Sequence, residues 1–266
     1  MKCQAIIDLI ERLAPKRLAE DWDNPGLLVG EPGAEVAKVL ICLDVSLEVV
    51  RQAIEAEAQL IVAHHPMIFK GLRHVRTDLY DGKLLQQLLQ HNIAVYAAHT
   101  NLDIAKGGVN DVLAARVGLE RLEGFAVTNP ETDDTIGRMG YLPEPMTLEA
   151  FAQQVKAGLG AEHIRVVKAN DRLIRKVALC SGAGADFIGK AAFKGADAYL
   201  TADVKYHDAQ RAVQQDINLI DGGHFATEFP MVEALAQYLQ TEMAKGKQSA
   251  EIITDTVSKD YFQVVL

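Results

Sequence analysis

Two stretches of this 266-residue chain repeat the same order of sequence patterns, and this repetition constrains the fold more than any single motif. KVLICLD at 38–44 and KVALCSG at 176–182 both place a lysine, an apolar run and a cysteine in matching positions. Each is followed by a helix-like segment and then a second apolar run, at 58–65 in the first stretch and 196–203 in the second. Strands that alternate with helices indicate mainly parallel sheets covered by helices.

The repetition extends to both sides of these segments. Upstream, DNPGLLVGEP at 23–32 resembles DTIGRMGYLP at 134–143, and downstream NIAVYAAH at 92–99 resembles INLIDGGH at 217–224. The predicted order of an edge strand, then strand, helix, strand, helix and strand therefore occurs twice. A repeat of this length indicates two related domains rather than a solenoid, and chance similarity between two βαβ units is the alternative.

These patterns predict an α/β protein made of two similar domains related by internal duplication. We place residues 1–126 and 222–266 in the first domain and residues 127–221 in the second. With 49% hydrophobic residues, the chain can bury one sizeable core or two small ones. Ser46 and Thr147 each precede a segment with helical spacing and are predicted to cap it.

The apolar run at 60–63 is predicted to be a strand, and it is followed directly by two histidines, His64 and His65. Pro66 cannot donate to a ladder, so the strand should stop and leave both imidazoles on the loop beyond its carboxyl end. In α/β folds that edge of the sheet is where ligands bind. One packed and one solvated histidine is the alternative interpretation of this pair.

Two further strand-like segments deliver similar groups to the same kind of position. The first leads to His99 and Asp103, and the second leads to His224 and Glu228. Glu228 follows His224 by the spacing that aligns side chains on a helix, whereas Pro230 disfavours helical geometry just before it. The pattern therefore leaves open whether His224 lies on a helix or in a loop.

Imidazoles and carboxylates that converge in this way are typical of a metal site. Even three of these imidazoles with the two carboxylates exceed what one tetrahedral site with an open position can use. They suit two ions bridged by a carboxylate, as in dinuclear hydrolases, and the remaining positive charge favours an anionic substrate. Zinc, manganese, iron, cobalt and nickel all accept such mixed donors.

Charge and composition exclude several other classes of protein. A formal charge of −9 argues against non-specific binding to nucleic acid. No apolar run approaches the roughly 20 residues of a membrane span, and Asp8 and Glu11 interrupt the N-terminal apolar stretch. Three scattered cysteines are too few for a disulfide framework. We expect a cytoplasmic enzyme or binding protein.

Two signals near these segments are weaker. Trp22 is either a packing anchor or a surface on which a purine stacks, and we favour packing. Its neighbours Asp21, Asp23 and Asn24 are predicted to shape a turn. SGAGAD at 181–186 resembles a phosphate-binding turn, although ordinary strand-to-helix turn chemistry explains it equally well.

Seven segments together carry a resemblance to a known family: DWDNPGLLVG (21–30), ICLDVS (41–46), AHHPMIF (63–69), AAHTNLD (97–103), LCSGAGADF (179–187), GADAYLTAD (195–203) and DGGHFATE (221–228). As an ordered set they resemble the signature segments of the Nif-three-like dinuclear metal-centre proteins. Members are commonly named GTP cyclohydrolase 1 type 2 homologues. The resemblance implies two similar α/β domains, a dinuclear centre in the cleft between them, and a homohexameric toroid assembled as a trimer of dimers.

The family's ligand pattern falls on five positions that all match here: His64, His65, Asp103, His224 and Glu228. The resemblance implies two divalent ions per subunit, with the glutamate bridging both. His99 lies outside this ligand set and is a candidate general acid or base, or a residue that orients a ligand.

The resemblance implies a metal-dependent hydrolase similar to GTP cyclohydrolase type 2, which would use a metal-activated water. Its substrate would be a purine nucleotide or a related small anion, with GTP as one candidate, although no residue can be identified as a guanine selector. A dinuclear phosphoesterase fits the same ligands. The contrasting hypothesis is a metal-binding toroidal scaffold or interaction protein without turnover.

Overall fold

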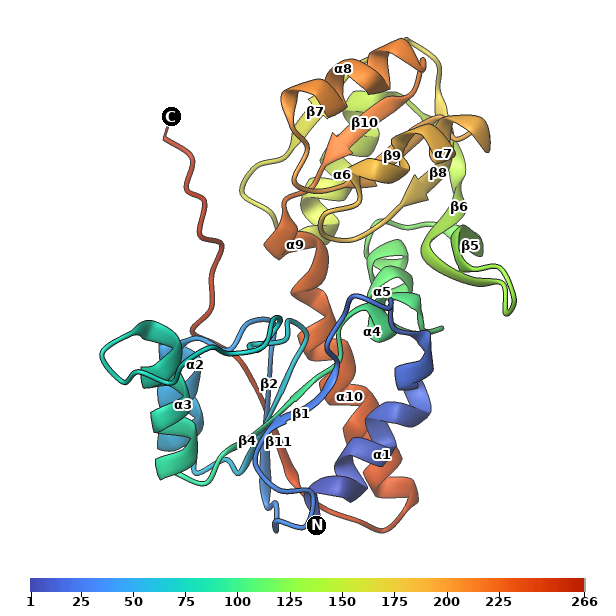
Figure 1. Ribbon diagram of the computed structural model, residues 1–266. Helices are drawn as coiled ribbons and strands as arrows, with labels where there is room; N and C mark the ends of the chain where they lie inside the picture. Colours follow the sequence, from blue (N-terminus) through green and yellow to red (C-terminus); the bar gives the residue numbers. More distant parts are fainter. Residues whose placement is uncertain (266) are drawn as a thin grey trace. The chain divides into compact units, whose positions relative to one another are not determined.

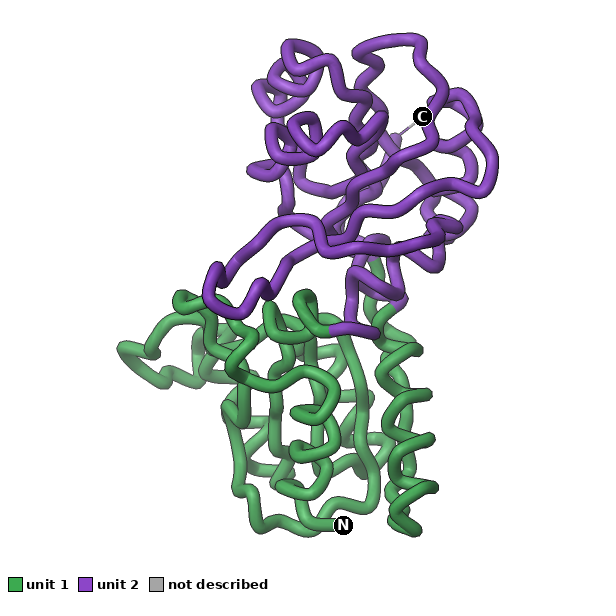
Figure 2. The backbone as a smooth tube through the Cα atoms, turned by 90° about the vertical axis from the view of Figure 1, so that its right-hand side faces the viewer, with its two compact units in different colours: residues 1–105, 231–259 green, residues 106–230, 260–266 purple. Residues whose placement is uncertain are grey.

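The computed structural model describes residues 1–265 and contains two compact units. Unit 1 comprises Met1–Ala105 and Met231–Lys259, and unit 2 comprises Lys106–Pro230 and Asp260–Leu266 (Figure 2). Each unit contains one β-sheet, so the predicted mixed α/β fold is confirmed. No helix within residues 1–265 combines the length and apolar character that crossing a membrane requires.

The sheet of unit 1 has five strands in the order β1-β4-β3-β2-β11. Their bounds are β1 (Gly26–Val29), β2 (Lys38–Cys42), β3 (Leu60–Ala63), β4 (Ala94–Ala97) and β11 (Glu251–Thr254). The strands β11, β2, β3 and β4 run parallel, and β1 pairs antiparallel with β4. Because both faces of this sheet are covered, every residue of β3 and β4 is buried.

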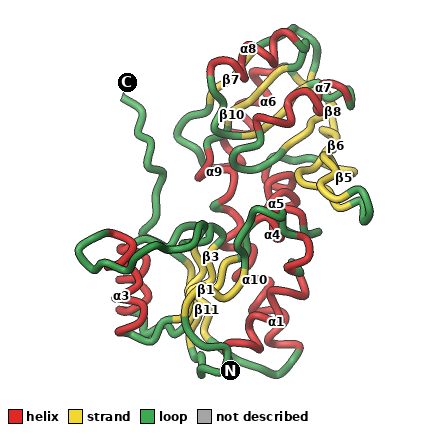
Figure 3. Tube along the Cα trace, viewed as in Figure 1, coloured by secondary structure: helices red, strands yellow, loops and turns green. Residues whose placement is uncertain are grey.

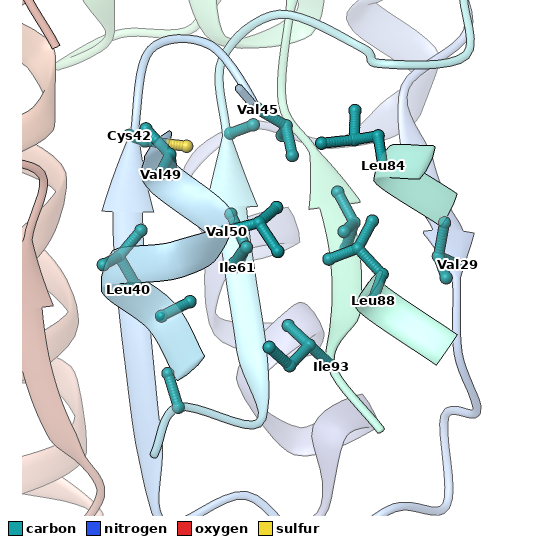
Figure 4. Close-up of a cluster of buried hydrophobic side chains, with 14 of the residues drawn as sticks. Val29, Leu40, Cys42, Val45, Val49, Val50, Ile61, Leu84, Leu88 and Ile93 are labelled. Carbon is teal, nitrogen blue, oxygen red and sulfur yellow. The ribbon is translucent and has the colours of Figure 1, made fainter. Parts of the chain in front are cut away.

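Helices cover both faces of this sheet. They are α1 (Cys3–Leu13), α2 (Leu47–Glu55), α3 (Tyr80–Gln90), α4 (Thr100–Ile104) and α10 (Pro230–Lys245), with a 3₁₀ turn η1 (Lys16–Leu18). Figure 1 shows α2 and α3 on one side of the sheet and α1 and α10 on the other. The core beneath α2 and α3 is built from aliphatic side chains such as Leu40, Val50, Ile61 and Leu88 (Figure 4).

Unit 2 has a six-stranded sheet in the order β5-β6-β8-β9-β10-β7. The bounds are β5 (Glu120–Asn129), β6 (Asp134–Met146), β7 (Arg165–Val167), β8 (Ile174–Leu179), β9 (Ala198–Thr201) and β10 (Asn218–Asp221). Here β8, β9 and β10 run parallel, whereas β5, β6 and β7 add antiparallel pairs. The long β5–β6 hairpin and the adjacent strands are coloured yellow in Figure 3.

The helices of unit 2 are α5 (Val109–Arg116), α6 (Leu148–Leu159), α7 (Ile188–Phe193), α8 (Tyr206–Gln214) and α9 (His224–Glu228), with a 3₁₀ turn η2 (Ala185–Phe187). The first four contribute to two separate buried clusters. One cluster joins α5 and α6 to the sheet through residues such as Leu113 and Phe151, and the other joins α7 and α8 through Ile188 and Ala212. The sheet is thus covered on both faces.

The boundaries of these units differ from the predicted domain boundaries at 126/127 and 221/222. Unit 2 begins at Lys106 because Leu113 and Ala114 of α5 pack into the core of unit 2. It extends to Pro230 because α9 contacts α5. As a consequence, His224 and Glu228 belong to unit 2.

Candidate metal centre

Unit 1 gathers three imidazoles at the carboxyl ends of its parallel strands. His64 and His65 follow β3, and His99 follows β4. Each offers one ring nitrogen, and these three atoms all lie within 4.8 Å of one another. Asp103 on α4 joins the group, with its Oδ1 3.7 Å from Nε2 of His64. The sequence-predicted residues of this unit therefore lie together.

Backbone pairing explains why the two adjacent histidines occupy this position. The amides of His64 and His65 donate to the carbonyls of Cys42 and Leu43, at 3.2 and 2.9 Å, so the pairing with the β2 side continues past β3. On the other side, the Ala98 amide donates to the carbonyl of Ala63 at 2.9 Å. The imidazoles are thus fixed to the rigid end of the sheet.

Unit 2 contributes a histidine and a carboxylate from one short helix. After β10, Gly223 adopts φ 82°, a conformation that favours glycine, and α9 then runs from His224 to Glu228. The structure resolves the open question about this segment, since Phe229 is helical despite the following Pro230. His224 Nε2 lies 3.0 Å from Oε2 of Glu228, as expected for side chains four residues apart on a helix.

Polar partners shift the pKa of His224 strongly in the absence of a metal. Its hydrogen bond to Glu228 raises the pKa to about 9, against the opposing effect of burial, and Asp203 adds to the rise. An imidazole with two carboxylate neighbours carries a proton at neutral pH. A cation that replaced the proton on Nε2 would lie between His224 and Glu228, while Asp203 would still accept from Nδ1–H.

All four of these imidazoles share one feature, which is an oxygen atom that accepts a hydrogen bond from Nδ1–H. The acceptors are the Ala98 carbonyl for His64 at 2.9 Å, Asp44 for His65 at 2.8 Å, Asp23 for His99 at 2.8 Å and Asp203 for His224 at 2.8 Å. In the neutral ring this bond places the proton on Nδ1 and leaves Nε2 as the atom that can bind a cation; in His224 this requires loss of the second proton, which lies on the side of Glu228. Metal-binding histidines are oriented in the same way, so the donors of each unit fit a divalent cation.

Sequence reasoning missed the three carboxylates that orient these rings. Asp44 and Asp203 each lie two residues beyond a parallel strand, the position that identified the histidines, so the same signal could have found them. Asp23 also accepts from the adjacent Asn24 amide at 2.7 Å. Its bond to His99 spans 76 positions and has no local sequence signal.

The glycine-rich segment at 181–186 supports Glu228. Gly182 has φ +56°, and a Cβ at this position would lie 2.1 Å from Oε1 of Glu228. Its amide donates to Oγ1 of Thr227 at 3.1 Å, which holds α9 against the turn. The absence of a side chain at 182 therefore makes room for the carboxylate.

The five predicted ligands are distributed over both units. His64, His65 and Asp103 belong to unit 1, and His224 and Glu228 belong to unit 2. His64, Asp103 and Glu228 are buried, which is unusual for such polar groups unless they are hydrogen-bonded, paired or bound to a cation. Each unit therefore presents its own set of nitrogen and oxygen donors.

Comparison with known proteins places this geometry in context. The sequence model of the Duf34/NIF3 (NGG1p interacting factor 3) family matches residues 1–260. A relative from Clostridium perfringens, named GTP cyclohydrolase 1 type 2 homolog, is 33% identical over 265 residues and covers 100% of both chains. One of the same name from Clostridium acetobutylicum is 34% identical over 246 residues, covering 92% of each.

Solved structures agree with the sequence matches. A Bacillus cereus protein related to NIF3 superimposes with a TM-score of 0.94 at 31% identity, covering 100% of this chain and 99% of that one. Reduced HcgD from Methanocaldococcus jannaschii gives a TM-score of 0.82 at 31% identity, covering 96% and 97%. The resemblance found in the sequence is confirmed by both comparisons.

Proposed function

This chain belongs to the Duf34/NIF3 family, and we propose that it is a dinuclear metal-dependent hydrolase acting on a purine nucleotide or a related small anion. The observation that carries the proposal is the shared orientation of four imidazoles, each held at Nδ1 by an oxygen acceptor. The name of its relatives, GTP cyclohydrolase 1 type 2 homolog, supports GTP as the first substrate to test.

In this proposal the donors of both units serve one centre with two divalent ions. His64, His65 and Asp103 would supply the ligands from unit 1, and His224 and Glu228 would supply those from unit 2, with Glu228 proposed to bridge the two ions as the family resemblance implies. The mixed donors suit zinc, manganese, iron, cobalt or nickel. Such ions would supply Lewis acidity and would lower the pKa of a bound water to about 7.

His99 is proposed to handle the proton in this chemistry. Its Nδ1–H donates to Asp23, whose side chain is fully buried, so the ring is held in one orientation. Oδ2 of Asp23 accepts from the Thr100 amide at 3.0 Å and from the Thr100 hydroxyl, which fixes the carboxylate in turn. An imidazole oriented in this way can accept or release a proton at Nε2.

The family resemblance adds proposals about assembly and origin. We propose a cytoplasmic homohexameric toroid built as a trimer of dimers, and an origin of the two units by internal duplication. Sedimentation equilibrium of the full-length chain tests the assembly, since a hexamer and a monomer differ sixfold in mass.

The function is tested by metal content and turnover in the same preparation. We expect two ions per chain by inductively coupled plasma mass spectrometry, and metal-dependent conversion of GTP followed by mass spectrometry. Formate release with ring opening would identify cyclohydrolase chemistry, whereas phosphate release would identify a phosphoesterase.

Glu228→Ala should lose both bound metal and turnover, while Glu162→Ala, at an exposed loop position, should retain both. A protein that binds two ions per chain but turns over neither GTP nor phosphoesters contradicts the hydrolase and supports the scaffold. A protein that takes up no metal contradicts the dinuclear centre itself.

A further inference from the structure

Two large aromatic side chains remain exposed beside the imidazoles of unit 1. Trp22 is 59% exposed and Phe69 is 44% exposed, so the expectation that Trp22 is a packing anchor is wrong. The centroids of these two rings lie 5.9 Å apart. The centroid of the His99 ring lies 6.2 Å from that of Trp22 and 6.3 Å from that of Phe69. The two rings thus form an aromatic wall that adjoins the donor cluster.

Hydrogen bonds fix the two loops that carry this wall. Asn24 donates from its side-chain amide to the carbonyl of Ile68 at 2.5 Å, which joins the loop of Trp22 to the loop of Phe69. Asp23 joins the Trp22 loop to the start of α4 through His99 and Thr100. The wall is therefore preorganised although its rings are exposed, as expected for a binding surface.

We propose that Trp22 and Phe69 stack against a planar heterocyclic ring of the ligand that binds at the metal centre. This inference rests on the proposed function and adds the residues that select an aromatic ligand. Exposed aromatic faces bind the faces of nucleobases without regard to base identity. Asp21 and Lys70, which adjoin the two aromatic residues in the sequence, are exposed as well.

The test compares two ligands that share a phosphate and a ribose but differ in the base. Zinc-loaded full-length protein is titrated with guanosine 5′-monophosphate and with ribose 5-phosphate. Trp22 is the only tryptophan of the chain, so intrinsic tryptophan fluorescence reports on the wall alone. We expect the nucleotide to bind more tightly and to quench this fluorescence, while ribose 5-phosphate leaves it unchanged.

Variants separate stacking from other contributions. Trp22→Leu and Phe69→Leu should each weaken nucleotide binding about tenfold by calorimetry and leave ribose 5-phosphate binding unchanged. Trp22→Phe, which keeps a ring, should retain most of the affinity. Phe193→Leu removes an aromatic that is 91% exposed in unit 2 and serves as the matched control.

Three results would overturn the inference. They are equal affinity for the two ligands, nucleotide binding that survives both leucine variants in zinc-loaded protein, and a change of oligomeric state in Trp22→Leu, which would show that a second copy covers the wall. Zinc content is measured in the same samples. A wild-type protein without zinc would overturn the metal centre of the proposed function, independently of the aromatic wall.

Discussion

Units 1 and 2 contain the same βαβαβ core and use its strand ends differently. In unit 1 the order is β2-α2-β3-α3-β4, and in unit 2 it is β8-α7-β9-α8-β10, with the three strands parallel and adjacent in both. The ends of β3 and β4 carry imidazoles directly. The segments after β8 and β9 instead carry Gly182, which makes room for Glu228, and Asp203, which accepts from His224. One framework thus supplies donors in one unit and supports for donors in the other.

The outer strands of the two sheets differ as well. In unit 1, β1 pairs with β4, whereas in unit 2 the segment predicted to match it, β6, pairs with β8 at the opposite end of the parallel core. The short strand β7 instead occupies the place beside β10. The similarity of the units therefore lies in the parallel core, where strand ends position the site.

The largest effect should come from filling the space that admits Glu228. Gly182→Ala places a methyl group where only 2.1 Å separates it from the carboxylate, at a positive φ that alanine tolerates poorly. Strain and overpacking together should destabilise unit 2 by about 3 kcal/mol and displace Glu228. Urea denaturation and metal content measure the two consequences.

Gly33→Ala in unit 1 is the matched control, because a Cβ there meets nothing within 4 Å. It should change neither stability nor metal content. If Gly182→Ala behaves like this control, the turn at 181–186 has no role in holding the carboxylate.

Removing the carboxylates that orient the imidazoles should have the next largest effect. Asp44→Ala frees the ring of His65 in unit 1, and Asp203→Ala frees the ring of His224 in unit 2. Loss of such a partner typically weakens metal binding 10- to 100-fold, or about 1.4–2.7 kcal/mol. Competition with a chromogenic zinc chelator measures the change for each variant.

Asp203 also has φ 54°, a backbone conformation that alanine tolerates poorly. Asp203→Gly therefore separates the loss of the carboxylate from the backbone strain that alanine would add. It should lose metal affinity like the alanine variant while it folds with less strain. Equal zinc affinity in wild type and all three variants would contradict the orienting role.

The sequence predicted the parallel core and the polar groups that follow its strands because both have local signals. Buried parallel strands appear as short continuous apolar runs, and the groups that follow them gather at one edge of the sheet. The predicted caps of α2 and α6 are confirmed, because Ser46 and Thr147 each precede a segment with helical spacing, which is again a local signal.

Features that depend on distant parts of the chain could not be predicted. β7 has only three residues, too few for a periodic pattern, and is held by pairing with β10. The exposure of Trp22 depends on bonds that tie its loop to His99 and Ile68, each more than 40 positions away. The packing of α5 into unit 2, which moved the boundary, depends likewise on contacts that the sequence alone does not show.

The two units should respond to opposite ends of the pH range in metal-free protein. Burial raises the pKa of Asp23, but hydrogen bonds from His99 and Thr100 outweigh it and lower the pKa to about 2. The resulting stabilisation is complete above pH 3.8 and is lost as the pH falls toward 2. For His224, whose pKa rises from 6.5 to about 9, stabilisation is complete below pH 6.5 and is lost as the pH rises toward 9.

Each effect should amount to about 1–2 kcal/mol, with the smaller value for His224 because solvent screens its partly exposed side chain. Hydrogen exchange followed by mass spectrometry, on peptides from each unit, resolves the two responses. Asp23→Asn should abolish the loss of stability at low pH in unit 1, and His224→Gln should abolish the loss of stability at high pH in unit 2. A response confined to one unit at both extremes would contradict this assignment.

The smallest effects test whether the two units are stable independently of each other. Ser46→Ala removes the acceptor for the Val49 amide at the start of α2, and Thr147→Ala removes the acceptor for the Ala150 amide at the start of α6. Each should cost about 1 kcal/mol, because an N-cap satisfies an amide that the helix leaves without a partner. Thr241→Ala, which removes only a bond to the Gln237 carbonyl within α10, should cost less than about 0.5 kcal/mol.

If each cap variant lowers hydrogen-exchange protection only in its own unit, the units unfold separately. Loss of protection in both units from either variant would instead show that the two cores unfold as one.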